Sequence, residues 1–194
     1  MARWSEHLGN FIRLAGDEDN EQVLDTFFIT RNYIPSNEEE KKEFEDFSLI
    51  TSCMGLLIHI AKADKIMHPE ERTRIIEDLT FQLEQRHFEY DSLKEKFGFS
   101  DREIITNIYN RMLADYEKGN LDLDKIIAVI DLVYQNNPEK RHYILRLCYY
   151  CALSDSNYDD EEEKTIRKIA GKLKISEAER ARIEKEVRIE MKEY

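Results

Sequence analysis

The residues of this chain that are best suited to chemistry are oxygen-bearing side chains in two short stretches of the sequence. The candidate metal ligands are Asp64, Glu71, Asp155, Asn157, Asp159 and Glu162. Carboxylate and amide oxygens are the ligands that hard divalent cations such as Ca²⁺ and Mg²⁺ prefer in proteins. We therefore expect a divalent cation, calcium or magnesium, to bind weakly at these side chains.

The second of the two stretches offers the denser set of oxygen ligands. Residues 155–163 contain six acidic residues and no basic residue, and their first five positions read Asp-x-Asn-x-Asp. This order matches the first half of a calcium loop, although Asp160 stands where an EF-hand has its glycine and Ile166 where it has its bidentate glutamate. The first stretch has fewer oxygens and a lysine, Lys65. If only one stretch binds a metal ion, we expect it to be the second.

Helix capping is the alternative explanation for the same acids. An aspartate just before a helix accepts hydrogen bonds from backbone N–H groups, and glutamates in the first turn interact with the positive end of the helix dipole, each by about 0.3–1 kcal/mol. Six carboxylates in one short segment also repel one another unless solvent, a helix N-terminus or a cation screens them. A solvated acidic loop without a metal ion therefore remains open for both stretches.

The two stretches belong to an internal repeat with an offset of 91 residues. At this offset Ala61 aligns with Ala152, Asp64 with Asp155, Glu70 with Glu161, Glu71 with Glu162, and Ile75 with Ile166. In each unit the pattern A-x-x-D-x6-E-x3-I places an aspartate after one apolar helix and two adjacent glutamates at the start of the next. The sequence therefore predicts two pseudo-repeated helix–loop–helix units.

The elements that must position these side chains are helices. Ser36 and Glu39 form a capping-box pattern, and an apolar stripe with helical spacing follows at Phe44, Phe47, Thr51, Met54, Ile58 and Ala61. Further helix starts are indicated at Pro69, Ser100 with Glu103, Asp122 or Asp124, Asn137 with Pro138, Glu161, and Ser176 with Glu179. We find no strand with sustained alternation. The predicted fold is an all-α bundle of about seven helices.

One glycine lies inside the first predicted helix. Gly55 stands within the apolar stripe and does not end it. A glycine weakens a helix by about 1 kcal/mol relative to alanine. Close approach of a neighbouring element to the backbone at Gly55 could offset this cost.

The first 43 residues differ from the rest of the chain. They carry a short apolar set that is consistent with an amphipathic turn or helix, namely Trp4, Phe11, Ile12 and Leu14, and then an acidic break. We expect residues 1–43 to form an N-terminal extension that packs on the main body. Residues 44–194 are expected to form the helical domain.

Composition narrows the class of protein. The chain has 194 residues and a formal net charge of −12, which argues against nucleic acid as a partner because phosphate binding needs a basic face. It lacks an uninterrupted apolar run of about 18 residues, and its first 16 residues do not resemble a signal peptide. Three cysteines cannot all pair within one chain. We expect a cytoplasmic protein with reduced thiols and no membrane insertion.

Other groups that could do chemistry are weaker candidates. Cys148 and Cys151 are spaced like part of a zinc or redox motif, but their apolar surroundings favour packing in the core. Zinc would need two more ligands, for which Cys53 and His59 are the available pair. No nucleophile elbow, Walker loop or H-E-x-x-H motif is present, so we expect no enzymatic activity. A metal-assisted hydrolase that uses the paired carboxylates is the remaining enzymatic alternative.

Two segments resemble the TerB-like family, helical domains named for a tellurite-resistance protein and also found in a membrane-anchored J-domain co-chaperone. They are I-A-K-A-D-K-I-M-H-P-E-E-R at residues 60–72 and A-L-S-D-S-N-Y-D-D-E-E-E-K at residues 152–164, and I-A-G-K-L-K-I-S-E-A-E at 169–179 is similar to the closing segment of the family. The resemblance covers roughly residues 46–190. It implies a helical bundle with pseudo-twofold halves, a role in stress response, and metal binding through Asp64, Glu71, Asp155 and Glu162.

The chain departs from the family pattern at two positions and lacks one associated motif. Lys65 and Ser156 stand where a glycine often follows the aspartate, and no His-Pro-Asp motif of a J domain is present. Our first hypothesis is a cytoplasmic TerB-like module that binds a divalent cation or acts in stress response. The alternative is a protein-interaction bundle whose acids only cap helices. In either case we expect a protein partner, which the sequence does not identify.

Overall fold

The computed structural model describes residues 36–63, 67, 69–84, 98–134, 136–154 and 158–193. Within these residues the secondary structure is entirely helical. The helices are α3 (Glu38–Ala61), α4 (Pro69–Glu84), α6 (Asp101–Glu117), α7 (Leu123–Tyr134), α8 (Pro138–Ala152), α9 (Asp160–Lys172) and α10 (Glu177–Glu193). The prediction of an all-α bundle is confirmed for the part of the chain that the structure describes.

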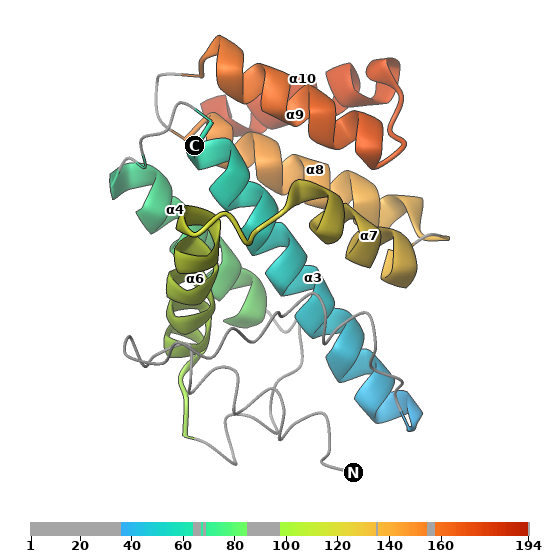
Figure 1. Ribbon diagram of the computed structural model, residues 1–194. Coiled ribbons are helices and arrows are strands. Elements are labelled where there is room, and N and C mark those ends of the chain that lie inside the picture. The colour runs from blue at the N-terminus through green and yellow to red at the C-terminus, as the bar shows by residue number, and fades with distance from the viewer. Residues whose placement is uncertain are drawn as a thin grey trace.

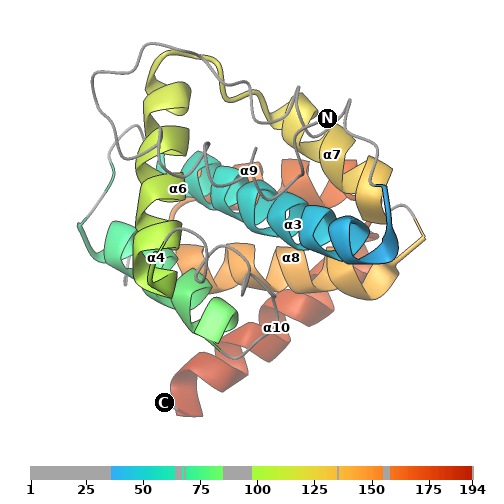
Figure 2. The same ribbon diagram turned by 90° about the horizontal axis from the view of Figure 1, so that it is seen from below.

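Helix α3 is the centre of the bundle (Figure 1). It packs against α4, α6, α7, α8 and α9, while α10 lies outside on α8 and α9. Seen from below, α4 and α6 lie to one side of α3, and α7 and α8 lie around the other (Figure 2). Every other described helix except α10 therefore packs directly on one central helix.

The central position of α3 follows from its composition. Nearly every residue from Phe44 to Ala61 is buried, including polar residues such as Ser48 and Thr51. The hydroxyls of these two residues donate to the carbonyls of Phe44 and Phe47, so they need no partner from another helix. Among the described helices α3 is long and apolar enough to span a membrane, but 83% of its apolar window is buried in the fold. This burial is consistent with the core helix of a soluble protein.

The start of α3 differs from the prediction by one residue. The N-cap is Asn37, whose Oδ1 accepts a hydrogen bond of 2.9 Å from the backbone N–H of Glu40, and not Ser36. Glu40 returns the interaction by accepting from the backbone N–H of Ser36 at 2.8 Å. Asparagine caps at least as well as serine, and the glutamate that follows it by three is Glu40 rather than Glu39. The helix also runs across the expected boundary at residue 43, and the division into an extension and a domain stays a prediction.

The other helix starts follow the predicted signals. Ser100 and Glu103 form a reciprocal capping box at α6, and Pro69 and Pro138 are the first residues of α4 and α8. Asp122 caps α7, since its Oδ1 lies 2.7 Å from the backbone nitrogen of Asp124. At α10 the Ser176 hydroxyl accepts from the N–H of Glu179, whose carboxylate accepts from the N–H of Ser176. Local polar groups therefore fix where these helices begin.

The close approach at Gly55 is confirmed. A Cβ atom at this position would lie 2.8 Å from Cδ1 of Ile126 on α7 and 3.1 Å from Cε of Met112 on α6. Both of these side chains are buried, so they have little space to move away. The absence of a side chain at Gly55 thus lets α6 and α7 pack closely on the central helix.

Candidate functional site

Three of the six predicted metal ligands lie within the part of the chain that the structure describes. Glu71 lies in the first turn of α4, Asp159 is the N-cap of α9, and Glu162 lies in the first turn of α9. Asp64, Asp155 and Asn157 lie outside the described residues, as does the predicted extension up to residue 35. The geometry of the site therefore rests on the two helix starts.

The two glutamates at the equivalent repeat positions are buried. Glu71 is 3% exposed and Glu162 is 7% exposed, whereas the glutamate before each of them, Glu70 or Glu161, is exposed. Carboxylates are rarely buried to this extent unless they are paired or ligate a metal ion, because burial removes their hydration. Helix-dipole stabilisation alone does not require this burial, since it also operates at an exposed position.

The helix ends around the two glutamates repeat with the predicted offset. Helices α3 and α8 end at Ala61 and Ala152, and α4 and α9 begin at Pro69 and Asp160. The isoleucines four residues after the buried glutamates, at positions 75 and 166, are both fully buried. Local geometry therefore agrees between the two units, while the pseudo-repeat as a symmetry of the whole bundle stays a prediction.

Both buried glutamates influence the electrostatics of one buried thiol. The thiol of Cys151 lies in the last turn of α8, and its pKa is raised well above the usual value of 9.0, first by burial and then by the charges of Glu71 and, among others, Glu162. Two carboxylates from different helices thus act on one thiol at the end of a third helix. The charges at the two helix starts thus share an influence on Cys151, but the described residues do not gather there into a cluster of three potential ligands.

Asp159 and Glu162 also form a capping box at the start of α9. Oδ1 of Asp159 accepts hydrogen bonds of 2.8 and 2.9 Å from the backbone N–H groups of Glu161 and Glu162. Oε2 of Glu162 accepts a bond of 3.0 Å from the backbone N–H of Asp159. Helix capping therefore accounts for these two side chains without a ligand, as the alternative hypothesis expects.

Tyr109 is a polar residue near Glu71 that the sequence did not single out. It is fully buried on α6, and among the described residues its hydroxyl has no hydrogen-bond partner. Burial raises its pKa, the nearby Arg72 lowers it, and the charges of Glu71 and Cys151 raise it further. The guanidinium of Arg72 lies 5.6 Å from the centre of its ring. Tyr109 lies in an apolar stripe of the sequence, so the sequence did not distinguish it from an ordinary core residue.

The described part of the site supplies only some of the ligands that a cation needs. Among the described residues no group of three or more His, Cys, Asp or Glu side chains is placed to hold a metal ion. Calcium takes 6–8 oxygen ligands, and magnesium takes fewer protein ligands and keeps several waters. Glu71 and Glu162 can contribute two carboxylates, and the predicted ligands of the two loops would have to add to them.

The alternative zinc set is not supported by its surroundings. Cys53, Cys148 and Cys151 are free and buried, and burial raises the pKa of Cys53 to about 12. A thiol with a raised pKa is a poor nucleophile and a poor metal ligand. Nε2 of His59 lies 3.0 Å from the carbonyl oxygen of Leu121. The interpretation of Cys148 and Cys151 as core residues is confirmed.

Comparison with known proteins gives one match. A family model described as "Tellurite resistance protein TerB" matches residues 51–185, which is more than half of the chain. The matched region begins within α3 and ends within α10, so it includes both buried glutamates. No curated protein and no solved structure matches the chain at a significant level.

Proposed function

The chain belongs to the TerB family, and we propose that it is a module that binds a divalent cation between its two helix–loop–helix units. We further propose that it acts in the cytoplasm, in a response to stress, and catalyses no reaction. The family is named after tellurite resistance. For this chain, a role in tellurite resistance is only part of the proposal.

The observation that carries the cation proposal is the burial of Glu71 and Glu162 at the equivalent starts of α4 and α9. Two buried carboxylates that converge would repel each other, and a divalent cation between them would turn this repulsion into attraction. Calcium and magnesium both favour carboxylate oxygens. A cation shared by the two units would therefore explain why the second glutamate of each pair is the buried one.

The loops would complete the coordination. Asp64 and Asp155 precede the two helices by equivalent distances in the sequence, and Asn157 and Asp159 add further oxygen atoms to the second loop. The capping box uses Oδ1 of Asp159 and Oε2 of Glu162. Binding through these side chains would fix the loops relative to the central helix, so the melting temperature would rise with the concentration of the cation.

Conservative substitutions of the buried and exposed glutamates test this proposal. Thermal melting of the full chain is measured with and without millimolar Ca²⁺, Mg²⁺, Mn²⁺ or Zn²⁺. We expect at least one of these ions to raise the melting temperature of the unsubstituted chain. Glu71→Gln and Glu162→Gln should each abolish most of this rise, because a neutral amide is a weaker ligand than a carboxylate. The matched controls Glu70→Gln and Glu161→Gln should keep it.

Two results would contradict the cation proposal. One is a well-folded chain whose melting temperature does not change with any of the four ions at millimolar concentration. The other is a rise that the control variants lose as much as the buried-site variants do, which would indicate non-specific screening of surface charge.

A protein-interaction module without a metal site is the second candidate, and the capping box at Asp159 and Glu162 favours it. In this case the Asp159→Ala/Glu162→Ala double variant, which removes both side chains of the capping box, would lose about 1 kcal/mol of cap stability. It would still bind the partner of the module as long as it folds. A folded double variant that no longer retains its partners in a pull-down would contradict this second candidate.

A further inference from the structure

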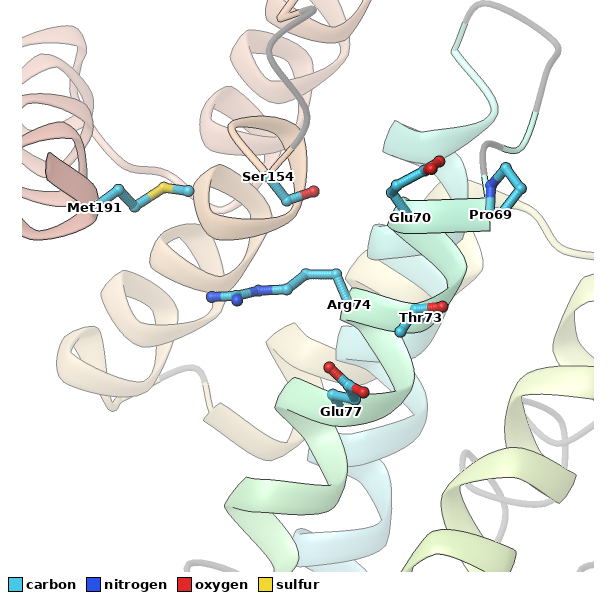
Figure 3. A pocket seen from close by; sticks show the side chains of 7 residues that line it. All are labelled: Pro69, Glu70, Thr73, Arg74, Glu77, Ser154 and Met191. Carbon is cyan, nitrogen blue, oxygen red and sulfur yellow. The ribbon is translucent and has the colours of Figure 1, made fainter. Parts of the chain in front are cut away.

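A groove runs along the outer face of α4 and lies apart from the two buried glutamates. Its first part has a volume of about 360 Å³ and is lined by Pro69, Glu70, Thr73, Arg74, Glu77, Ser154 and Met191. Figure 3 shows Arg74 reaching from α4 across this part toward α8, with Met191 on the α10 side. The second part measures about 610 Å³ and shares Arg74 and Met191 with the first. The two parts therefore form one continuous depression.

The arrangement of three helices produces this groove. Helix α4 packs on α3, α6 and α8, whereas α10 packs on α8 and α9, so α4 and α10 flank α8. The buried stripe of α4 contains Ile75 and Leu79. The groove side follows a second stripe of the same helix, at positions 70, 74, 77 and 81, which has the spacing of one helix face. The outer face of α4 thus lacks a covering helix among the described residues.

The groove presents apolar side chains to solvent. Phe81 lines its second part and is 54% exposed, although a large aromatic side chain gains free energy when it is buried. Met191 of α10 and Tyr150 of α8 complete the apolar lining. Methionine adapts its shape to different partners, and exposed aromatic residues often anchor interfaces. These side chains suit an apolar ligand surface.

Carboxylates outnumber cations around this apolar lining. Arg74 pairs with Asp78 at 2.9 Å, and Arg146 pairs with Glu186 at 3.1 Å and with Glu190 at 2.6 Å. The lining residues and their ion-pair partners carry four carboxylates, of Glu70, Glu77, Asp78 and Glu190, and two guanidinium groups, of Arg74 and Arg146. The groove is therefore negatively charged, in a chain whose net charge is itself −12.

We propose that this groove binds a basic amphipathic helix of a partner protein. The apolar face of such a helix would cover Phe81 and Met191, and its lysine or arginine side chains would face Glu70 and Glu77. The stripe from Glu70 to Phe81 is about 17 Å long at 1.5 Å per residue, which corresponds to three turns of a bound helix. Apolar anchors at i, i+3 or i+4, and i+7 would match this length.

A synthetic peptide of known chemistry tests the proposal on the full chain. The probe is a fluorescently labelled amphipathic peptide of leucine and lysine, about 14 residues long, and binding is followed by fluorescence anisotropy. Phe81→Ser should weaken binding about tenfold, as removal of an aromatic anchor commonly does. Glu77→Lys should weaken it and should reduce its dependence on salt. Both side chains are exposed, so both variants should fold.

Matched controls separate the groove from general attraction to an acidic protein. Leu132→Ser on α7 removes an apolar side chain that is 58% exposed, and Glu139→Lys reverses an exposed charge at the start of α8. Both controls should bind the peptide like the unsubstituted chain. A peptide with glutamate in place of lysine should not bind.

Three outcomes would overturn the proposal. The first is no binding of the basic peptide, and the second is equal weakening by the groove variants and the controls. The third concerns Trp4, the single tryptophan of the chain. If Phe81→Ser shifts the emission of Trp4 while the Leu132→Ser control does not, the groove is occupied by the N-terminal residues of the chain itself. In that case it is not a site for a partner protein. Because none of these variants alters Glu71 or Glu162, failure here leaves the cation proposal unaffected.

Discussion

His59 shows how a single polar residue is accommodated beside the core. Its Nε2 lies 3.0 Å from the carbonyl oxygen of Leu121, and its ring meets that of Tyr116 edge-on with centres 5.0 Å apart. Burial lowers the pKa of His59 from its usual 6.5, and a nearby lysine, Lys168, lowers it further. The bond to Leu121 and the charge of Asp122 act in the opposite direction, and the net shift is downward.

This lowered pKa predicts a pH dependence of stability. Below about 6.5 the unfolded chain takes up a proton at His59 more readily than the folded chain, so unfolding is favoured. The contribution of His59 is therefore fully present above this pH and is lost as the pH falls toward its folded-state pKa. In chemical denaturation between pH 7.5 and 5, His59→Gln should show a smaller fall in the free energy of unfolding than the unsubstituted chain. An equal fall in both would contradict this assignment.

The sequence also could not predict which of the candidate ligands are buried. Glu70 and Glu71 are chemically identical neighbours, as are Glu161 and Glu162, and only the tertiary packing of the helices distinguishes the buried member. The sequence identified both pairs through the repeat and assigned the second member of each to the site. It could not show that these two carboxylates act on the same cysteine, because that depends on the tertiary arrangement of three helices.

Among the helices, the contact between α3 and α7 depends on Gly55. Ile126 of α7 is fully buried, and its Cδ1 occupies the space that a Cβ at Gly55 would need. Alanine at this position would gain about 1 kcal/mol of helix propensity but would overpack the core, which costs about 1–3 kcal/mol. The balance between these two effects is set by the terminal methyl of Ile126.

Removal of this methyl group should relieve the overpacking at Gly55. We predict that Gly55→Ala lowers the free energy of unfolding in the unsubstituted chain. In the Ile126→Val background, which lacks Cδ1, the same change should be more favourable by about 1 kcal/mol. Chemical denaturation of the four members of this double-mutant cycle measures the difference. Additive effects, with no coupling between the two positions, would contradict the close approach.

Helix boundaries were predicted well where the signal is local. The capping boxes at Ser100 and Ser176 and the prolines at the starts of α4 and α8 lie where the sequence placed them. The error at α3 arose because Asn37 is as good a cap as Ser36 and the run of glutamates that follows satisfies either register.

For the whole molecule, the class of fold followed from the sequence because helical periodicity and caps extend over most of the chain. The groove between α4 and α10 did not, since Phe81 and Met191 are far apart in the sequence and ordinary in their own helices. The signal for the groove that the sequence did contain is a helix face at positions 70, 74, 77 and 81 that ends in an aromatic residue. It becomes meaningful only when α10 is seen on the far side of α8 (Figure 2).

The central claim is that the two repeat units hold one cation in common. Isothermal titration calorimetry of the full chain with Ca²⁺ and with Mg²⁺ measures how many ions bind per chain. We predict one ion per chain, with binding lost in both Glu71→Gln and Glu162→Gln. Two independent ions per chain, each lost with only one of these substitutions, would show two separate loops. No binding heat for either ion in a folded sample at several temperatures would contradict the cation site itself.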